Sequence, residues 1–134
     1  MARRVALDTG VLAGIERRVL DRRAILAPSD DVGLPVVVLA EYRVGLELAG
    51  PEHRARMEGL LRRLTSTATV IPYDEMIMEE HVRLLAWTHR HGCPRGQHDL
   101  IIAATCLATD RVLLTTDRKA RFEDLPGLRV RLLG

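Results

Sequence analysis

The chain has 134 residues, of which 47% are hydrophobic, and its formal net charge is only +2. This length and apolar content suffice for one core without disulfides or a structural metal, so we expect residues 1–134 to form one domain. A net charge this small gives no evidence for a nucleic-acid partner. The aromatic residues, 3% of the chain, are too few for the base-stacking surfaces of many single-strand binding domains.

The composition also bears on the cellular compartment. The chain contains no run of about eighteen apolar residues, and its start leads directly into a strand-like segment instead of a signal peptide. Its two cysteines, Cys93 and Cys106, are too few for a disulfide framework and suit a reducing environment. We therefore expect a cytoplasmic protein that does not associate with membranes.

The first half of the chain alternates short apolar runs with amphipathic stretches. Val5-Ala6-Leu7 predicts a strand, and residues 9–18 predict a short helix. Residues 34–38 predict a second strand, with Pro35 favouring a late start, and a helix follows from about Leu39. Residues 51–64 predict a helix that opens on a proline, and residues 69–71 predict a weak strand.

The second half continues this alternation. Asp74 predicts the N-cap of a helix that ends at Gly92, and residues 92–96 predict a loop. Residues 99–109 are apolar nearly all round, which predicts a helix buried on most sides. Residues 112–115 and 128–132 predict the last strands. Strand and helix in regular alternation predict an α/β sandwich with a central, mostly parallel, twisted sheet and helices on both faces.

Four carboxylates are embedded in apolar sequence. Most of the 18 acids, Glu16 among them, lie among arginines on polar helical faces, and we expect them to be solvated. The four exceptions need partners, because desolvating a lone carboxylate costs several kcal/mol. Each taken alone could be a helix cap or a turn residue. The four are Asp8, Glu41, Asp99 and Asp117.

The predicted topology brings these acids together. Asp8 and Asp117 follow buried strands, and the carboxyl ends of parallel strands share one edge, where ligands bind. We expect Glu41 and Asp99 each to begin a helix and to reach the same edge. Four carboxylates so close together repel one another, and divalent cations bound between them would offset this repulsion. A set of oxygen ligands favours Mg²⁺ or Mn²⁺ over zinc.

Five segments, taken in order, resemble a VapC-type PIN domain over nearly the whole chain. They are Leu7-Asp8-Thr9, Ala40-Glu41-Tyr42-Arg43-Val44-Gly45-Leu46, a Gly92-x-Pro94 turn before Asp99-Leu100-Ile101-Ile102-Ala103-Ala104, Leu114-Thr115-Thr116-Asp117, and Pro126-Gly127-Leu128. The resemblance implies a metal-dependent endoribonuclease with those four acids in its active site. It also implies the toxin of a type II toxin–antitoxin pair, a VapB-type antitoxin as partner, and a homodimer. Gly10 departs from the family, which often has serine or asparagine there.

Ligand chemistry suggests a mechanism. Mg²⁺ or Mn²⁺ held by Asp8, Asp99 and Asp117 would polarise a phosphodiester of RNA and lower the pKa of a bound water. Glu41 would bind the metal or orient the water. Hydroxyl groups near the ions could support the ligands, and they belong to Thr9, Thr115 and Thr116. Two arginine pairs are candidate RNA contacts, and they are Arg17-Arg18 and Arg22-Arg23. Arginines on a solvated helix face would give the same sequence pattern.

Two other functions remain open. Leu7-Asp8-Thr9-Gly10 resembles the strand-end aspartate of haloacid-dehalogenase-type phosphatases, in which Asp8 would be a covalent nucleophile. That chemistry uses a second aspartate two residues on, where this chain has Gly10. The other alternative is a binding module that kept the PIN fold without the chemistry. The presence of all four acids counts against it.

Overall fold

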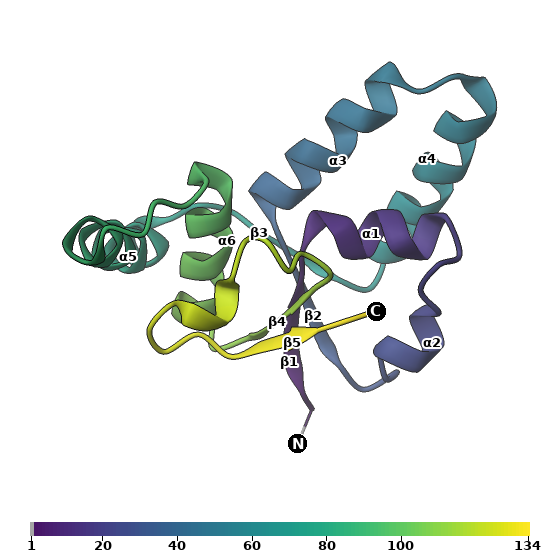
Figure 1. The fold of residues 1–134 in the computed structure, drawn as a ribbon. Helices are drawn as coiled ribbons and strands as arrows, with labels where there is room; N and C mark the ends of the chain where they lie inside the picture. Colours follow the sequence, from purple (N-terminus) through teal and green to yellow (C-terminus); the bar gives the residue numbers. More distant parts are fainter. Residues whose placement is uncertain (1) are drawn as a thin grey trace.

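The computed structural model describes residues 2–134 and contains one sheet of five parallel strands in the order β3-β2-β1-β4-β5 (Figure 1). The strands are β1 (Arg4–Leu7), β2 (Asp31–Pro35), β3 (Thr69–Ile71), β4 (Val112–Thr115) and β5 (Val130–Leu132). The helices are α1 (Thr9–Glu16), α2 (Arg22–Ile25), α3 (Val36–Leu48), α4 (Pro51–Thr65), α5 (Glu75–His91), α6 (Gln97–Ala108) and a short 3₁₀ helix, η1 (Phe122–Asp124). The predicted α/β architecture is confirmed.

Helices cover both faces of the sheet. Figure 1 views the strands nearly edge-on, with α5 and α6 on one side and α1, α2 and α4 on the other. Helix α1 packs against α3 and α4, whereas α5 packs against α6. The central strand β1 is buried on both faces, which explains why Val5-Ala6-Leu7 is continuously apolar. No helix within residues 2–134 combines the length and apolar character needed to cross a membrane.

Helix α6 is the most deeply buried helix of the core. Six of its twelve residues are buried, as its all-round apolar sequence predicts. Cys106 lies among them, and burial raises the pKa of its thiol to about 12, so this cysteine is unreactive at neutral pH. The helix begins at Gln97, two residues before the predicted start at Asp99, and it ends at Ala108.

Both predicted ends of α5 are confirmed. The Asp74 carboxylate accepts a hydrogen bond from the backbone N–H of Ile77 at 2.9 Å, which is an N-cap. Gly92 ends the helix with φ of 60°, a left-handed conformation that glycine adopts without a steric penalty. The buried side of α5 includes Ile77, Leu84 and Thr88.

The predicted second strand was placed too late in the chain. The strand ends at Pro35, and the residues 36–38 predicted as strand form the first turn of α3. Proline at the N-cap ends the β2 ladder because it has no N–H to donate. The buried residues of α3 are Val38, Tyr42 and Leu46, which are spaced four apart and form one helical stripe. The apolar run 36–40 therefore belongs to a helix.

Ion pairs hold the amino-terminal ends of the strands together. The Arg111 guanidinium is 5% exposed, and its Nη1 donates to the carbonyl oxygens of Val5 and Asp31 at 3.2 and 2.7 Å and to the Asp31 carboxylate at 3.0 Å. Arg4 pairs with Asp31 at 2.7 Å. Arg3 pairs with Asp30 at 2.6 Å, and this hydrogen bond holds the pKa of Asp30 below its usual value. We call these five charged side chains the amino edge: Arg3, Arg4, Asp30, Asp31 and Arg111.

Candidate active site

Asp8 is the most enclosed of the four predicted acids. It follows β1 directly and precedes α1, and it is only 7% exposed. Its Oδ1 accepts a hydrogen bond from the backbone N–H of Thr9 at 2.8 Å. Its Oδ2 accepts a hydrogen bond from the Thr115 hydroxyl at 2.7 Å, so the end of β4 fixes the carboxylate at the end of β1.

Asp117 lies two residues beyond the end of β4 and is exposed. Its Oδ1 accepts hydrogen bonds from the backbone N–H groups of Lys119 and Ala120, both at 3.0 Å. Its own N–H donates to the Thr115 hydroxyl oxygen at 3.0 Å. Thr115 therefore links Asp117 to Asp8. One oxygen of Asp117 stabilises a turn, and Oδ2 accepts no hydrogen bond from the described residues.

Glu41 reaches the same edge from α3. It is the sixth residue of that helix and does not begin it, because α3 starts at Val36. The Thr9 hydroxyl donates to Glu41 Oε1 at 3.2 Å. The Nδ1 atom of His98 lies 3.5 Å from Glu41 Oε2, and the His98 side chain is 58% exposed. Neither Glu41 contact follows from its local sequence, because both partners are distant along the chain.

Asp99 is the third residue of α6 and is half-buried in the first turn. Burial raises the pKa of Asp99, and the carboxylates of Asp8, Asp117 and Glu41 raise it further. Burial also raises the pKa of Asp8, with smaller contributions from Asp117 and Glu41. These mutual effects place all four acids in one electrostatic neighbourhood, which we call the acidic edge.

The acidic edge lacks compensating cations. Within residues 2–134, no arginine or lysine forms an ion pair with Asp8, Glu41, Asp99 or Asp117, and the basic side chain that contacts one of them is His98, at Glu41. The same residues contain no three acidic, histidine or cysteine side chains close enough together to enclose a metal ion. The acids are thus grouped without forming a closed ligand cage. Their all-oxygen donor set and unbalanced negative charge suit a hard divalent cation.

The packing of Gly10 against Thr116 explains the departure from the family at residue 10. A Cβ atom at Gly10 would lie 2.5 Å from the Thr116 hydroxyl oxygen, which is closer than real contacts allow. Thr116 therefore occupies the space that a serine or asparagine side chain would need. Its hydroxyl forms no hydrogen bond with the described residues, whereas those of Thr9 and Thr115 contact the acids directly.

The four candidate RNA-binding arginines lie at the junction of α1 and α2. Arg17, Arg18 and Arg23 are exposed, and Arg22 is half-buried. None of the four forms an ion pair with a carboxylate among the described residues. Arg18 and Arg22 line a surface groove together with Arg63 of α4. Asp21 is the one acid that lines this groove, so positive charge predominates near the carboxyl end of α1.

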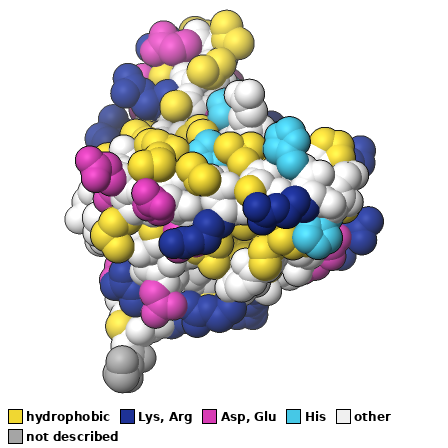
Figure 2. Space-filling model, turned by 90° about the vertical axis from the view of Figure 1, so that its left-hand side faces the viewer, with side chains coloured by type: hydrophobic (Ala, Val, Ile, Leu, Met, Phe, Trp, Pro, Cys, Tyr) yellow, Lys and Arg dark blue, Asp and Glu magenta, His cyan; other side chains and the backbone are white. Residues whose placement is uncertain are grey.

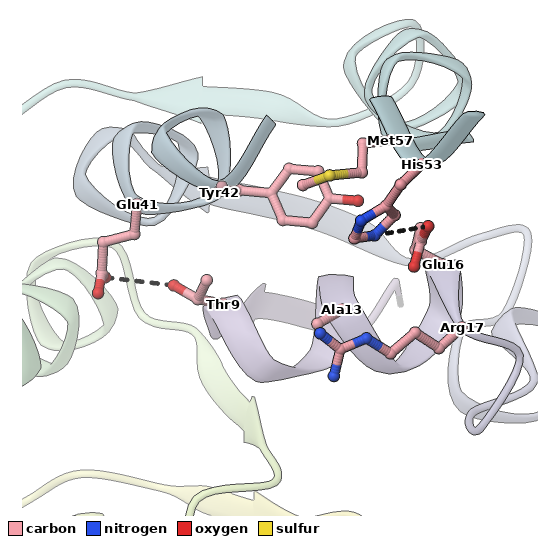
Figure 3. Close-up of a pocket in the computed structure, with 9 residues that line it drawn as sticks. Thr9, Ala13, Glu16, Arg17, Glu41, Tyr42, His53 and Met57 are labelled. Atoms are coloured by element: carbon pink, nitrogen blue, oxygen red, sulfur yellow. Dashed lines mark hydrogen bonds and ion pairs between the residues drawn. The ribbon is translucent and has the colours of Figure 1, made fainter. Parts of the chain in front are cut away.

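A cavity of about 180 Å³ lies between α1, α3 and α4 (Figure 3). Thr9 and Glu41 form one end of it, so it adjoins the acidic edge. Glu16 lies at the other end with a carboxylate that is only 3% exposed, and its Oε1 contacts His53 Nε2 at 3.2 Å and Arg56 Nε at 3.4 Å. The prediction that Glu16 is solvated was wrong. Position 16 follows the buried Leu12 by one helical turn, which could have indicated burial.

Comparisons with known proteins agree with this architecture. Residues 5–128 match the PIN domain family. The chain is 24% identical over 125 residues to Ribonuclease VapC of Rickettsia bellii, covering 92% of each protein. It superimposes on the structure of VapBC2 from Rickettsia felis bound to a promoter DNA fragment with a TM-score of 0.85 at 20% identity, covering 98% of this chain and 99% of that one. For VapBC-5 from Mycobacterium tuberculosis, a member of the VapBC family of toxin-antitoxin systems, the TM-score is 0.73 at 27% identity over 97% of each chain.

Proposed function

Because the chain belongs to the PIN-domain family, we propose that it is a metal-dependent endoribonuclease and the toxin of a type II toxin–antitoxin pair. The observation that carries this proposal is the acidic edge, where four carboxylates share one neighbourhood and have no arginine or lysine partner. A relative named Ribonuclease VapC supports ribonuclease activity. The structures of VapBC toxin-antitoxin complexes support the toxin role.

The ligands of the proposed ion are Asp8, Asp99 and Asp117. When bound there, Mg²⁺ or Mn²⁺ supplies a Lewis acid for the phosphodiester and lowers the pKa of a water ligand. Thr115 has a positioning role because its hydroxyl donates to Asp8 and accepts from the Asp117 backbone. This one side chain thus fixes the separation of two ligands before any ion arrives.

Glu41 is the group proposed to handle the attacking water. Its Oε1 is fixed by the Thr9 hydroxyl, which leaves Oε2 to orient the water and accept its proton. His98 lies beside that oxygen and is mostly exposed, so it can contact the RNA near the scissile phosphate. No protein nucleophile is required in this mechanism.

The RNA backbone is assigned to the four arginines near the α1–α2 junction. An arginine that lacks a carboxylate partner can form paired hydrogen bonds to a phosphate, whereas a paired arginine must first break its ion pair. Arg18 and Arg22 line the groove that holds Arg63, which adds a third guanidinium to this surface. Substrate binding should therefore weaken as the salt concentration rises.

The proposed partners are a VapB-type antitoxin and a second copy of the chain, in the cytoplasm. The antitoxin is inferred from the VapBC complexes. Helix α5 exposes Met76 and Val82, at 67% and 54%, and Figure 2 shows further hydrophobic side chains on the side of the molecule where α5 lies. An exposed apolar face of this kind supports homodimer formation.

The two alternatives receive less support. The match to the PIN domain argues against a haloacid-dehalogenase-type phosphatase, and Gly10 stands where that chemistry needs a second aspartate. A catalytically silent binding module would have no need for four crowded carboxylates, whose charges help to raise the pKa of Asp8 and Asp99. The ribonuclease is thus the function that the acidic edge supports best.

The test uses purified protein with RNA and with DNA of the same sequence, in Mn²⁺ and in EDTA. We expect cleavage of RNA only, and only with the metal. In cells, expression of the chain alone should arrest growth, and co-expression of its antitoxin should restore it. Equal RNA cleavage in EDTA would overturn the metal mechanism. Growth that is unaffected by the wild type would overturn the toxin role.

A further inference from the structure

The cavity between α1, α3 and α4 is continuous with the proposed catalytic centre (Figure 3). Thr9 and Glu41 belong to both, since their mutual hydrogen bond of 3.2 Å forms one end of the cavity. A polymeric substrate whose phosphate lies at the acidic edge would therefore present a neighbouring nucleotide to the cavity. The wall is apolar along its length, and Ala13, Tyr42 and Met57 contribute to it.

The inner part of the cavity contains hydrogen-bonding groups that the fold does not fully use. The Tyr42 hydroxyl is buried and has no hydrogen-bond partner among residues 2–134. Figure 3 shows this hydroxyl directed toward His53, next to the Glu16 carboxylate. An unsatisfied buried hydroxyl destabilises a fold, so such a group points to a ligand. The His53 side chain is 40% exposed and lines the cavity beside this hydroxyl.

The charge of the cavity restricts the ligand. The Glu16 side chain is almost completely enclosed, and its Oε1 pairs with Arg56 and contacts His53, so Oε2 remains as an acceptor for a group with N–H donors. The contacts from His53 and Arg56 both reach Oε1, and no hydrogen bond to Oε2 is formed by the described residues. The site therefore offers a carboxylate acceptor and a hydroxyl at the end of an apolar slot. A flat heterocycle with ring N–H and amino groups has the matching chemistry.

We propose that this cavity is a base-binding subsite that selects a guanine next to the scissile phosphate. Guanine presents N1–H and N2–H side by side to a carboxylate, and its O6 can accept from a hydroxyl. Uracil offers one ring N–H between two carbonyl groups, which the Glu16 carboxylate would repel. Arg17, which also lines the cavity, is available for the phosphate of the same nucleotide. This inference rests on the proposed ribonuclease function.

The first experiment maps cleavage sites in a randomised RNA pool by sequencing, with Mn²⁺ and wild-type protein. We expect guanine to be enriched at one fixed position beside the cut. Tyr42→Phe should lower that enrichment about fivefold to tenfold, which corresponds to the loss of one hydrogen bond. Tyr73→Phe is the matched control, because the Tyr73 hydroxyl bonds to His81 of α5 and lies outside the cavity. It should leave the enrichment unchanged.

The second experiment replaces the selected guanosine with inosine, which lacks only the N2 amino group. Binding is measured in an Asp99→Asn background, which slows cleavage. With Glu16 intact, we expect this RNA to bind about tenfold more weakly than the guanosine RNA. In a Glu16→Gln variant of the same background, the two substrates should bind almost equally, because the carboxylate that distinguishes them is gone. This double-substitution cycle separates a direct contact from a general loss of stability. Melting curves check that both variants fold.

The other outcomes would contradict either the proposed function or the base subsite. A wild type that cleaves no RNA overturns the proposed function itself. A wild type that cleaves RNA without a base preference, or an inosine effect that persists in Glu16→Gln, overturns the base subsite alone. If Tyr42→Phe weakens antitoxin binding and leaves the guanine preference intact, the cavity is a protein-docking pocket and the proposal is wrong.

Discussion

Both ends of the sheet carry carboxylates, which are paired with arginines at one end and lack such partners at the other. At the amino edge, Asp30 and Asp31 each pair with an arginine, and Arg111 adds hydrogen bonds to two strands. At the acidic edge, four carboxylates gather and no arginine or lysine among the described residues pairs with them. Carboxylates near the ends of the same strands therefore stabilise the fold at one end and repel one another at the other.

This difference teaches how the chain separates stability from function. At the amino edge, charge that arginines neutralise within the fold contributes to folding. Charge left unbalanced costs stability until a cation from solution arrives, so its retention points to a ligand. The comparison predicts opposite responses to substitution, to metal and to pH at the two edges.

The largest expected effect is on catalysis. Asp99→Asn should lower the rate of RNA cleavage by more than about 100-fold, since loss of even an outer partner of a metal ligand costs about 10- to 100-fold. Asp110→Asn is the matched control, because Asp110 is an exposed acid that pairs with Arg129 at the surface. It should cleave at the wild-type rate. Rates are measured with Mn²⁺ at saturating RNA, and comparable activity in the two variants would remove Asp99 from the active site.

The next effect concerns folding at the amino edge. Arg111→Met removes a buried guanidinium, so the carbonyl oxygens of Val5 and Asp31 lose a donor and the Asp31 carboxylate keeps only Arg4. The free energy of unfolding should fall by about 1–3 kcal/mol, because buried acceptors lose their donor; the ion pair itself adds less, since the Asp31 side chain is 37% exposed. Arg129→Met, which removes an exposed pair, should change it by less than about 0.5 kcal/mol. Urea denaturation measures both, and similar losses would contradict the role given to Arg111.

Metal should act on the acidic edge alone. At about a hundredfold excess over its dissociation constant, Mn²⁺ should stabilise the wild type by about 2.7 kcal/mol. In EDTA, Asp99→Asn should melt at or above the wild-type temperature, because it relieves repulsion, and its shift with Mn²⁺ should be smaller. Asp8→Asn should gain less stability, because the Asp8 carboxylate also accepts hydrogen bonds from Thr115 and Thr9. Equal Mn²⁺ shifts in all three proteins would make these acids structural.

The smallest effect is a difference in pH dependence, measured in EDTA between about pH 3 and 7. Burial raises the pKa of Asp99 above its usual value of 3.8, so its contribution to stability is full below 3.8 and is lost as pH rises through the raised value. Arg3 lowers the pKa of Asp30, so that contribution is present above 3.8 and is lost as pH falls. The melting advantage of Asp99→Asn should therefore grow with rising pH. The penalty of Asp30→Asn should shrink with falling pH, and parallel profiles would contradict the comparison.

The sequence predicted the order of strands and helices better than the boundary between β2 and α3. Buried strands such as Val5-Ala6-Leu7 are short and continuously apolar, and the cap at Asp74 and the stop at Gly92 are local chemistry. The boundary between β2 and α3 was wrong, because an apolar run of five residues has no period that distinguishes strand from helix. Only the spacing of Val38 and Tyr42, which extends beyond that run, identifies the helix.

The candidate active site was likewise predicted only in part. Four embedded acids were predicted from strand ends and from five segments that resemble the PIN domain, and the family assignment is confirmed. A turn was one of the roles left open for Asp117, and its carboxylate does stabilise one, whereas the burial of Glu16 was not predicted. Glu16 contacts His53, which lies 37 positions further along the chain, so no local pattern contains this pair.

The hydrogen bond between Asp8 and Thr115 joins residues 107 positions apart. Their strands, β1 and β4, are neighbours in the sheet, although almost the whole chain lies between them. Closing so long a loop is a late and slow step in folding. A ribosome that has released only the first hundred residues therefore carries a chain without β4 and without Asp117. The proposed metal site, to which Asp117 belongs, can therefore be assembled only when synthesis is nearly complete.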